Sequence, residues 1–183
     1  MLRQTLLAAG AALALSAGAA TAQTMSGASP SNPPPPAAMP TTATLPFLAL
    51  AGESDIFEIT SSQMAVMRSQ NPEVRRFATM LIDHHTRTSN IALAQAKAAG
   101  LMPAPPVLGP QKRMLIDQLA SAGAADFDRV YLQQQVPAHE QALALHATYA
   151  SSGDTPQLRT AARGAIPFVT QHLADARRML GGM

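Results

Sequence analysis

Proline and glycine divide residues 46–181 into a few long stretches that favour helix. Asn71-Pro72 is typical of a helix N-cap followed by proline at the first helical position. Gly100 and the proline-rich run after it end that helix, and the run 151–156 (SSGDTP) ends one helix and begins another. No window alternates polar and apolar residues as a half-buried strand does. The sequence therefore predicts helices over 46–69, 72–99, 111–121, 126–151 and 156–180.

Four of these helices are long, and short links join the first to the second and the third to the fourth. We therefore predict an all-α fold, an antiparallel four-helix bundle over 46–181, with the short helix at 111–121 in the connection between the second and third long helices. Pro137 and Pro167 lie inside predicted helices, where each removes a hydrogen bond and kinks the axis. Such kinks either let a long helix wrap the core or aim side chains toward a site.

The start of the chain has a different composition. Arg3, an apolar run and a small-residue cleavage site ending at Ala22 predict a secretory signal peptide over 1–22. Residues 23–45 are mostly proline, serine, threonine and alanine without charge, which predicts a disordered linker. We therefore expect an exported protein that is periplasmic or secreted, with no transmembrane segment in the mature chain. In one version of this hypothesis, the protein is also associated with the outer membrane.

The amino-acid composition argues against several classes of site and function. The absence of cysteine excludes disulfides and thiolate metal sites. The 13 basic and 11 acidic residues nearly balance and only 4% of residues are aromatic, so we expect no nucleic-acid partner. No nucleophile with a paired base and no phosphate-binding glycine loop is recognisable. An enzyme would therefore have to be a metal-dependent oxidoreductase, and we favour a non-enzymatic role.

The helix predicted at 72–99 carries two adjacent histidines among apolar residues. An apolar stripe through Phe77 and Leu81 continues to His84 at helical spacing. We therefore expect His84 to face the core and His85 to lie on the flank of the helix.

Each long helix carries one polar residue near its midpoint on the expected core face. They are Glu58, His84, His139 and His172. Midpoints of antiparallel helices lie at the same height, so these side chains are expected to meet in one central layer. Three imidazoles and one carboxylate are suitable ligands for a single ion of Zn, Cu, Fe or Mn.

Three other residues, Asp83, His85 and Asp128, are candidates for supporting the ligands through hydrogen bonds. His146 lies about 10 Å beyond His139 along its helix and is expected outside the layer. The alternative is a layer without metal, in which histidine and glutamate only fix the register of the helices. The protein would then be a structural or interaction module of the cell envelope, with an envelope partner.

A distinctive pattern runs through four stretches: IFEITSSQMA, NPEVRRFATMLIDHH, GAADFDRVYLQQQVPAHEQAL and AIPFVTQHL. This pattern resembles an exported bacterial family known as domain of unknown function 4142, over about 46–180. The resemblance implies a ferritin-like four-helix bundle in the cell envelope and implies no activity. Its motif positions fall on Glu58, Asp83, His84, Phe127, Asp128, Tyr131, His139, Pro167 and His172.

The pattern departs from ferritin-like di-iron proteins in its acidic residues. Those proteins use a Glu on each of two helices and a Glu-x-x-His on each of the other two. Here the residue three positions before each expected core histidine is Leu81, Val136 or Val169. With too few carboxylates to balance two iron ions, we expect a mononuclear site rather than a di-iron centre.

Overall fold

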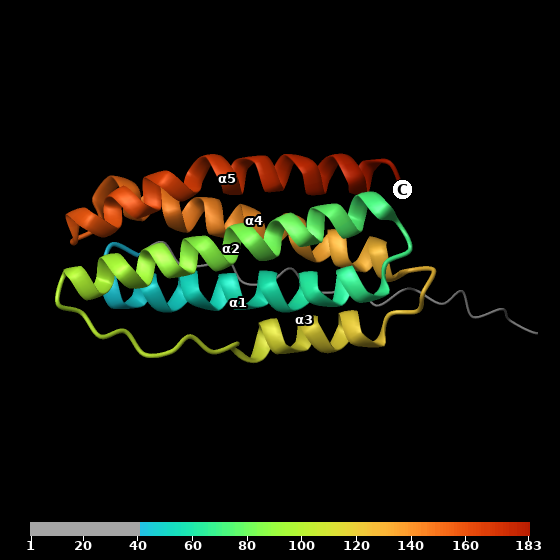
Figure 1. The fold of residues 1–183 in the computed structure, drawn as a ribbon, viewed down its shortest axis with the longest axis horizontal. Helices are drawn as coiled ribbons and strands as arrows, with labels where there is room; N and C mark the ends of the chain where they lie inside the picture. Colours follow the sequence, from blue (N-terminus) through green and yellow to red (C-terminus); the bar gives the residue numbers. More distant parts are fainter. Residues whose placement is uncertain (1–40) are drawn as a thin grey trace, which may run out of the picture. The chain divides into compact units, whose positions relative to one another are not determined.

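The structure, a computed structural model, describes residues 41–183. This part of the chain consists of five α-helices without a strand (Figure 1): α1 (Thr44–Arg68), α2 (Pro72–Ala98), α3 (Pro110–Ser121), α4 (Phe127–Ser152) and α5 (Pro156–Gly181). The all-α prediction is confirmed, and each predicted boundary lies within two residues of the observed one. The predicted signal peptide (1–22) and most of the predicted linker (23–45) fall outside the described residues.

The helices begin and end at the breaks that the sequence marks. Asn71 caps α2, because its side chain accepts a hydrogen bond from the backbone N–H of Glu73, and Pro72 follows the cap. Gly100, with φ of +75°, takes the left-handed conformation just after α2. Both α4 and α5 continue through their interior residues Pro137 and Pro167.

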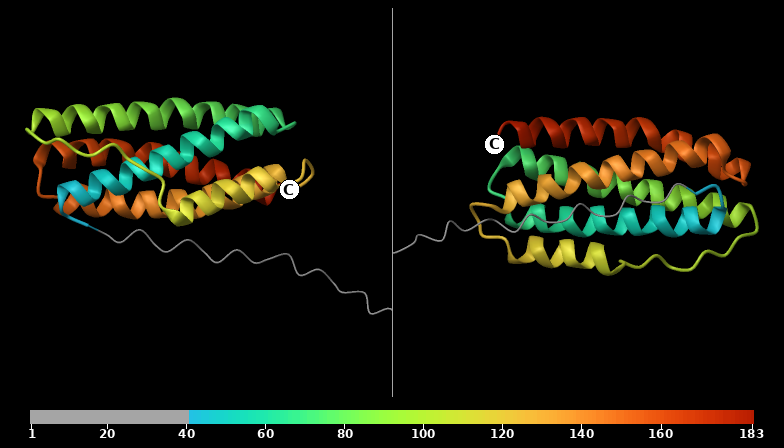
Figure 2. Two further views of the ribbon diagram at one scale, coloured as in Figure 1. Left: turned by 90° about the horizontal axis from the view of Figure 1, so that it is seen from below. Right: turned by 180° about the vertical axis from the view of Figure 1, so that it is seen from behind.

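The four long helices pack in a ring. In that ring α1 lies against α2 and α4, and α5 lies against the same two helices (Figures 1 and 2). The short helix α3 packs beside α1 and α4. No helix within 41–183 combines the length and the apolar character that crossing a membrane requires.

Two large apolar clusters fill the interior, one on each side of a polar layer. One cluster includes Phe77 and Leu81 of α2 and Tyr131 of α4. The other includes Phe47 of α1 and Tyr149 of α4. In each long helix, the buried polar residues of the candidate site lie along the chain between the parts that form these clusters.

Candidate metal centre

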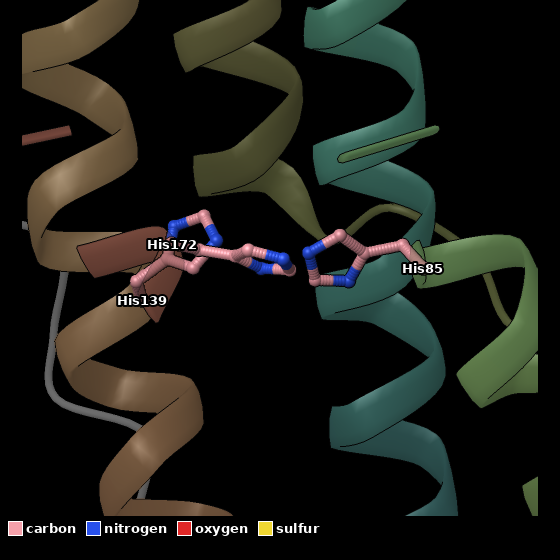
Figure 3. A group of neighbouring side chains, drawn as sticks. All are labelled: His85, His139 and His172. Atoms are coloured by element: carbon pink, nitrogen blue, oxygen red, sulfur yellow. The ribbon is translucent and has the colours of Figure 1, made fainter. Parts of the chain in front are cut away.

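Three histidines meet in this polar layer (Figure 3). His85 of α2, His139 of α4 and His172 of α5 each offer a ring nitrogen, and these three atoms lie within 4.8 Å of one another. Their side chains are 5%, 0% and 1% exposed. We call these three residues the histidine triad. Because its members come from three helices, tertiary packing rather than a local motif creates it.

The structure corrects the prediction for the two adjacent histidines. His85 is buried and His84 is only partly buried, so the expectation that His84 faces the core and His85 the flank is wrong. A step of three from Leu81 reaches His84 and a step of four reaches His85, and both fit a repeat of 3.6 residues. Two turns beyond His84 on the same face lies Ile91, which is 51% exposed, whereas the buried face of the helix continues to Ala96, which is 0% exposed.

Two members of the triad have one ring nitrogen fixed by a hydrogen-bond acceptor. The Nδ1 atom of His85 donates to Oδ1 of Asp55 at 2.8 Å, and Nδ1 of His139 donates to the carbonyl of Gln135 at 2.9 Å. In a neutral ring the other nitrogen, Nε2, then carries a lone pair. Neither Nε2 atom has a hydrogen-bond partner among residues 41–183, although both are buried.

The third member is held by the histidine that the prediction placed in the core. Nε2 of His172 lies 2.8 Å from Nδ1 of His84, and the two rings stack with centroids 5.1 Å apart. Nδ1 of His172 is buried and has no hydrogen-bond partner in the part of the chain that the structure describes. When Nε2 donates to His84, this Nδ1 atom carries the lone pair. We call Nε2 of His85, Nε2 of His139 and Nδ1 of His172 the open nitrogens.

Asp55 is a site residue that the sequence interpretation missed. It is 8% exposed and bonds both His85 and the hydroxyl of Ser89. Asp55 precedes Glu58 by three positions, so the two carboxylates share one face of α1. The predicted core face of this helix carried Glu58 alone, and the spacing of three between Asp55 and Glu58 is the sequence signal that could have identified Asp55.

Glu58 is buried in the same layer, as predicted, with 1% of its surface exposed. Its Oε1 atom lies 3.8 Å from Nδ1 of His139, which is the nitrogen already bonded to Gln135. Within the described residues neither carboxylate oxygen has a hydrogen-bond partner. Glu58 therefore contributes negative charge beside the triad, rather than a fourth atom to the group of open nitrogens.

Two other predicted supporting residues lie away from the triad. Asp83 is exposed on α2. Asp128 stands eleven residues before His139 in α4, a distance of about 16 Å along the helix. In the structure, the groups that orient the three rings of the triad are therefore not Asp83 and Asp128. They are Asp55, His84 and the backbone carbonyl of Gln135.

Burial sets the charge of the triad. It lowers the pKa of His139, and it lowers the pKa of His172 to about 2 with help from the neighbouring His139, His85 and His84. His85 differs: burial also acts to lower its pKa, but the hydrogen bond to Asp55 and the charge of Glu58 together raise it above its usual value. At neutral pH, His139 and His172 are therefore neutral rings that can donate lone pairs.

The donor set fits a transition metal. Neutral imidazole nitrogens are common ligands of Zn, Cu, Fe and Ni, whereas Mg, Ca and Mn prefer oxygen atoms. The second nitrogen of a metal-binding histidine is normally held by a carboxylate, a backbone carbonyl or water. His85 and His139 have such a carboxylate or carbonyl partner, and His172 is paired with the ring of His84 instead. Buried polar atoms without partners are rare in proteins, and within the described residues each ring of the triad carries one.

The comparisons with known proteins agree with this fold. Among curated proteins, none matches the sequence. A crystal structure of a DUF305 fragment from Deinococcus radiodurans is 16% identical, with a TM-score of 0.67 over 76% of this chain and 96% of that chain. CopM in the Cu(II)-bound form is 17% identical, with a TM-score of 0.67 over 76% of this chain and 97% of that chain. At such low identity both establish a shared helical fold alone.

The family is clear from the sequence itself. A family model described as a domain of unknown function, DUF4142, matches residues 29–179, which confirms the resemblance noted from the motif pattern. The chain belongs to the DUF4142 family.

Proposed function

We propose that this protein binds one transition-metal ion through His85, His139 and His172. The observation that carries the proposal is the set of open nitrogens: each ring has one nitrogen hydrogen-bonded and the other buried without a partner within 41–183. These rings face one another, with centroids 5.3 to 5.6 Å apart. An ion between them would give all three nitrogens a partner at once.

The alternative, a polar layer that only fixes helix register, fits this arrangement less well. Such a layer stabilises a core when its members hydrogen-bond to one another. Here the open nitrogens and both oxygens of Glu58 lack partners in the described part of the chain. A buried carboxylate without a hydrogen bond is costly, and a cation beside it would offset that cost.

Copper is our first candidate for the ion and zinc the second. Both accept imidazole ligands readily. The similar fold of CopM, which was solved with Cu(II), supports copper as the first choice to test. Iron remains a candidate on the same ligand chemistry, and manganese is the least favoured because the site offers few oxygens.

The role that we propose is metal binding or buffering outside the cytoplasm, without catalytic turnover. The predicted signal peptide and linker support export to the periplasm or cell envelope. We further propose that the ring of four long helices is a ferritin-like bundle, which the family motif pattern and the short links between α1 and α2 and between α4 and α5 support.

Metal content tests the proposal directly. The mature protein would be purified without chelator, reconstituted separately with Cu(II) and Zn(II), desalted and analysed by mass spectrometry. A His139→Gln, His172→Gln double variant keeps buried polar side chains of similar size, and its helix content would be checked by circular dichroism. We expect about one ion per parent chain and almost none in the variant. A parent protein that retains neither of these metals, nor iron or manganese after reconstitution with Fe(II) or Mn(II), would refute the proposal and favour the structural layer.

A further inference from the structure

A cleft of about 570 Å³ lies between the second half of α2 and the first half of α5, with residues of α1 in its wall. Its lining is mostly apolar and includes Phe47, Ile91, Ala161 and Phe168. Ile91 and Phe168 are 51% and 47% exposed, so the cleft meets the surface at these side chains. Nothing in the proposed metal site itself accounts for this space.

A smaller cavity, of about 10 Å³, lies beside the histidine triad. Its wall contains His85 and His172 together with His84. Five residues line both spaces: Asp55, Thr88, His146, Ala165 and Phe168. The two cavities therefore share a wall, and the smaller one reaches two of the three proposed ligands, His85 and His172.

The triad needs such a route, because its rings are at most 5% exposed and a hydrated ion cannot reach them through packed side chains. We infer that this cleft is the entrance for the metal ion and that His146 binds the ion transiently on its way to the triad. The inference rests on the proposed metal-binding function and adds a route and a further metal ligand to it.

His146 has the position and the chemistry for this step. It stands seven residues after His139 in α4, about 10 Å along the axis, and lines both cavities. The edge-to-face contact with Phe47, at 5.6 Å between centroids, holds its ring. Its Nδ1 atom is buried and finds no hydrogen-bond partner anywhere in 41–183. Burial lowers its pKa, so the ring is neutral at pH 7 and can donate a lone pair.

Phe168 stands where the two cavities meet. Its ring contacts His84 edge to face, with centroids 5.1 Å apart. His84 in turn holds His172. A side chain of the wall that the two cavities share is thus in contact with the group that orients one proposed ligand.

Gly164 provides a way to close the entrance without disturbing the helix. It is an exposed residue of the cleft wall, and a Cβ atom added there would meet nothing within 4 Å. Gly164→Phe would place a ring in the mouth of the cleft. Gly164→Ala is the matched control, because it also replaces the helical glycine with a better helix former but leaves the cleft open.

The test is the rate at which the apo protein takes up Cu(II) buffered with glycine, followed by stopped flow, together with the final metal content. Gly164→Phe should slow uptake by about tenfold, within the range over which single substitutions change association rates. Gly164→Ala should match the parent. His146→Gln should also slow uptake, while all three variants finally hold the same single ion.

The outcomes separate the two proposals. A parent chain that binds neither copper nor, in the same assay, zinc, iron or manganese at equilibrium overturns the proposed function and this inference with it. One ion per chain with equal uptake rates in the parent and Gly164→Phe overturns the entrance alone. If Gly164→Phe takes up copper slowly but His146→Gln takes it up at the parent rate, the cleft remains the proposed entrance and His146 does not bind the ion on its way.

Discussion

The Nδ1 atom of His84 lies 2.8 Å from the Nε2 atom of His172, across the contact between α2 and α5. His84 is partly buried and His172 is 1% exposed, so the outer ring orients the inner one. The adjacent histidines of α2 therefore have different tasks. His85 is itself a proposed ligand, whereas His84 holds a ligand that belongs to another helix.

Replacing His84 should weaken metal binding without abolishing it. His84→Ala leaves Nε2 of His172 without its partner, and loss of such an orienting group typically costs about 10- to 100-fold in metal affinity. Competition with a coloured chelator would measure the affinity. His84→Asn offers an amide oxygen in place of Nδ1 and should recover part of the loss. Equal affinity in the parent and His84→Ala would show that His84 does not orient the site.

Asp55→Asn should lower the pKa of His85. The negative charge of Asp55 and its hydrogen bond both raise the pKa of His85, against the effect of burial. The substitution keeps the shape of the side chain but removes the charge and weakens the hydrogen bond. An NMR titration of the apo protein, followed at the ring protons of His85, would measure the change. The same variant should bind metal about tenfold more weakly. A His85 pKa that does not move would mean that Asp55 does not control the charge of this ring.

Glu58→Gln should change stability and metal affinity in opposite directions. The glutamine side chain has nearly the same size and removes a charge that is buried without a hydrogen bond within the described residues. The apo protein should therefore gain up to about 1 kcal/mol in its free energy of unfolding. The proposed cation would lose a nearby negative charge, and its affinity should fall about tenfold, or about 1.4 kcal/mol.

Urea unfolding of apo Glu58→Gln would give the first quantity and chelator competition the second. A variant that is less stable in the apo form would show that the carboxylate makes a favourable contact of its own there.

The apo protein should lose stability as the pH falls below about 6.5. His139 and His172 have pKa values below the ordinary 6.5 in the folded protein, about 2 for His172, so the unfolded chain takes up their protons first. The contribution of these two groups to the free energy of unfolding is fully present above pH 6.5. Below pH 6.5 it declines by up to about 1.4 kcal/mol per pH unit for each group. His85 acts in the opposite sense: its raised pKa contributes stability below 6.5 that is lost as the pH rises through the folded value.

Urea unfolding at several values between pH 7.5 and 4.5 would test the predicted decline. The His139→Gln, His172→Gln variant is the control, because it lacks both lowered groups and should show a flatter profile. A parent protein as stable at pH 4.5 as at pH 7.5 would contradict the assigned charge states.

The helices were predictable because their limits are local. Asn71 and Pro72 are adjacent in the sequence, and the cap they form in the structure needs no information from elsewhere. The core positions of His139, His172 and Glu58 also followed from helical periodicity, since each lies among residues that are buried on one face.

The choice between His84 and His85 was not predictable in the same way. Their directions differ by about 100° around the helix axis, and the apolar stripe fits either position. What decides is how α2 rotates against α1 and α5, which is set by contacts between distant parts of the chain. The pair His85–Asp55 spans 30 positions and the pair His84–His172 spans 88, so no local pattern reveals them.

The polar layer divides its chemistry among the helices. The histidines come from α2, α4 and α5, whereas α1 contributes no imidazole and supplies both buried carboxylates, Asp55 and Glu58. The buried negative charge beside the triad thus comes from one helix and the ring donors from three others. Substitutions in α1 would consequently change the selectivity and retention of the proposed ion while the three proposed ligands stay the same.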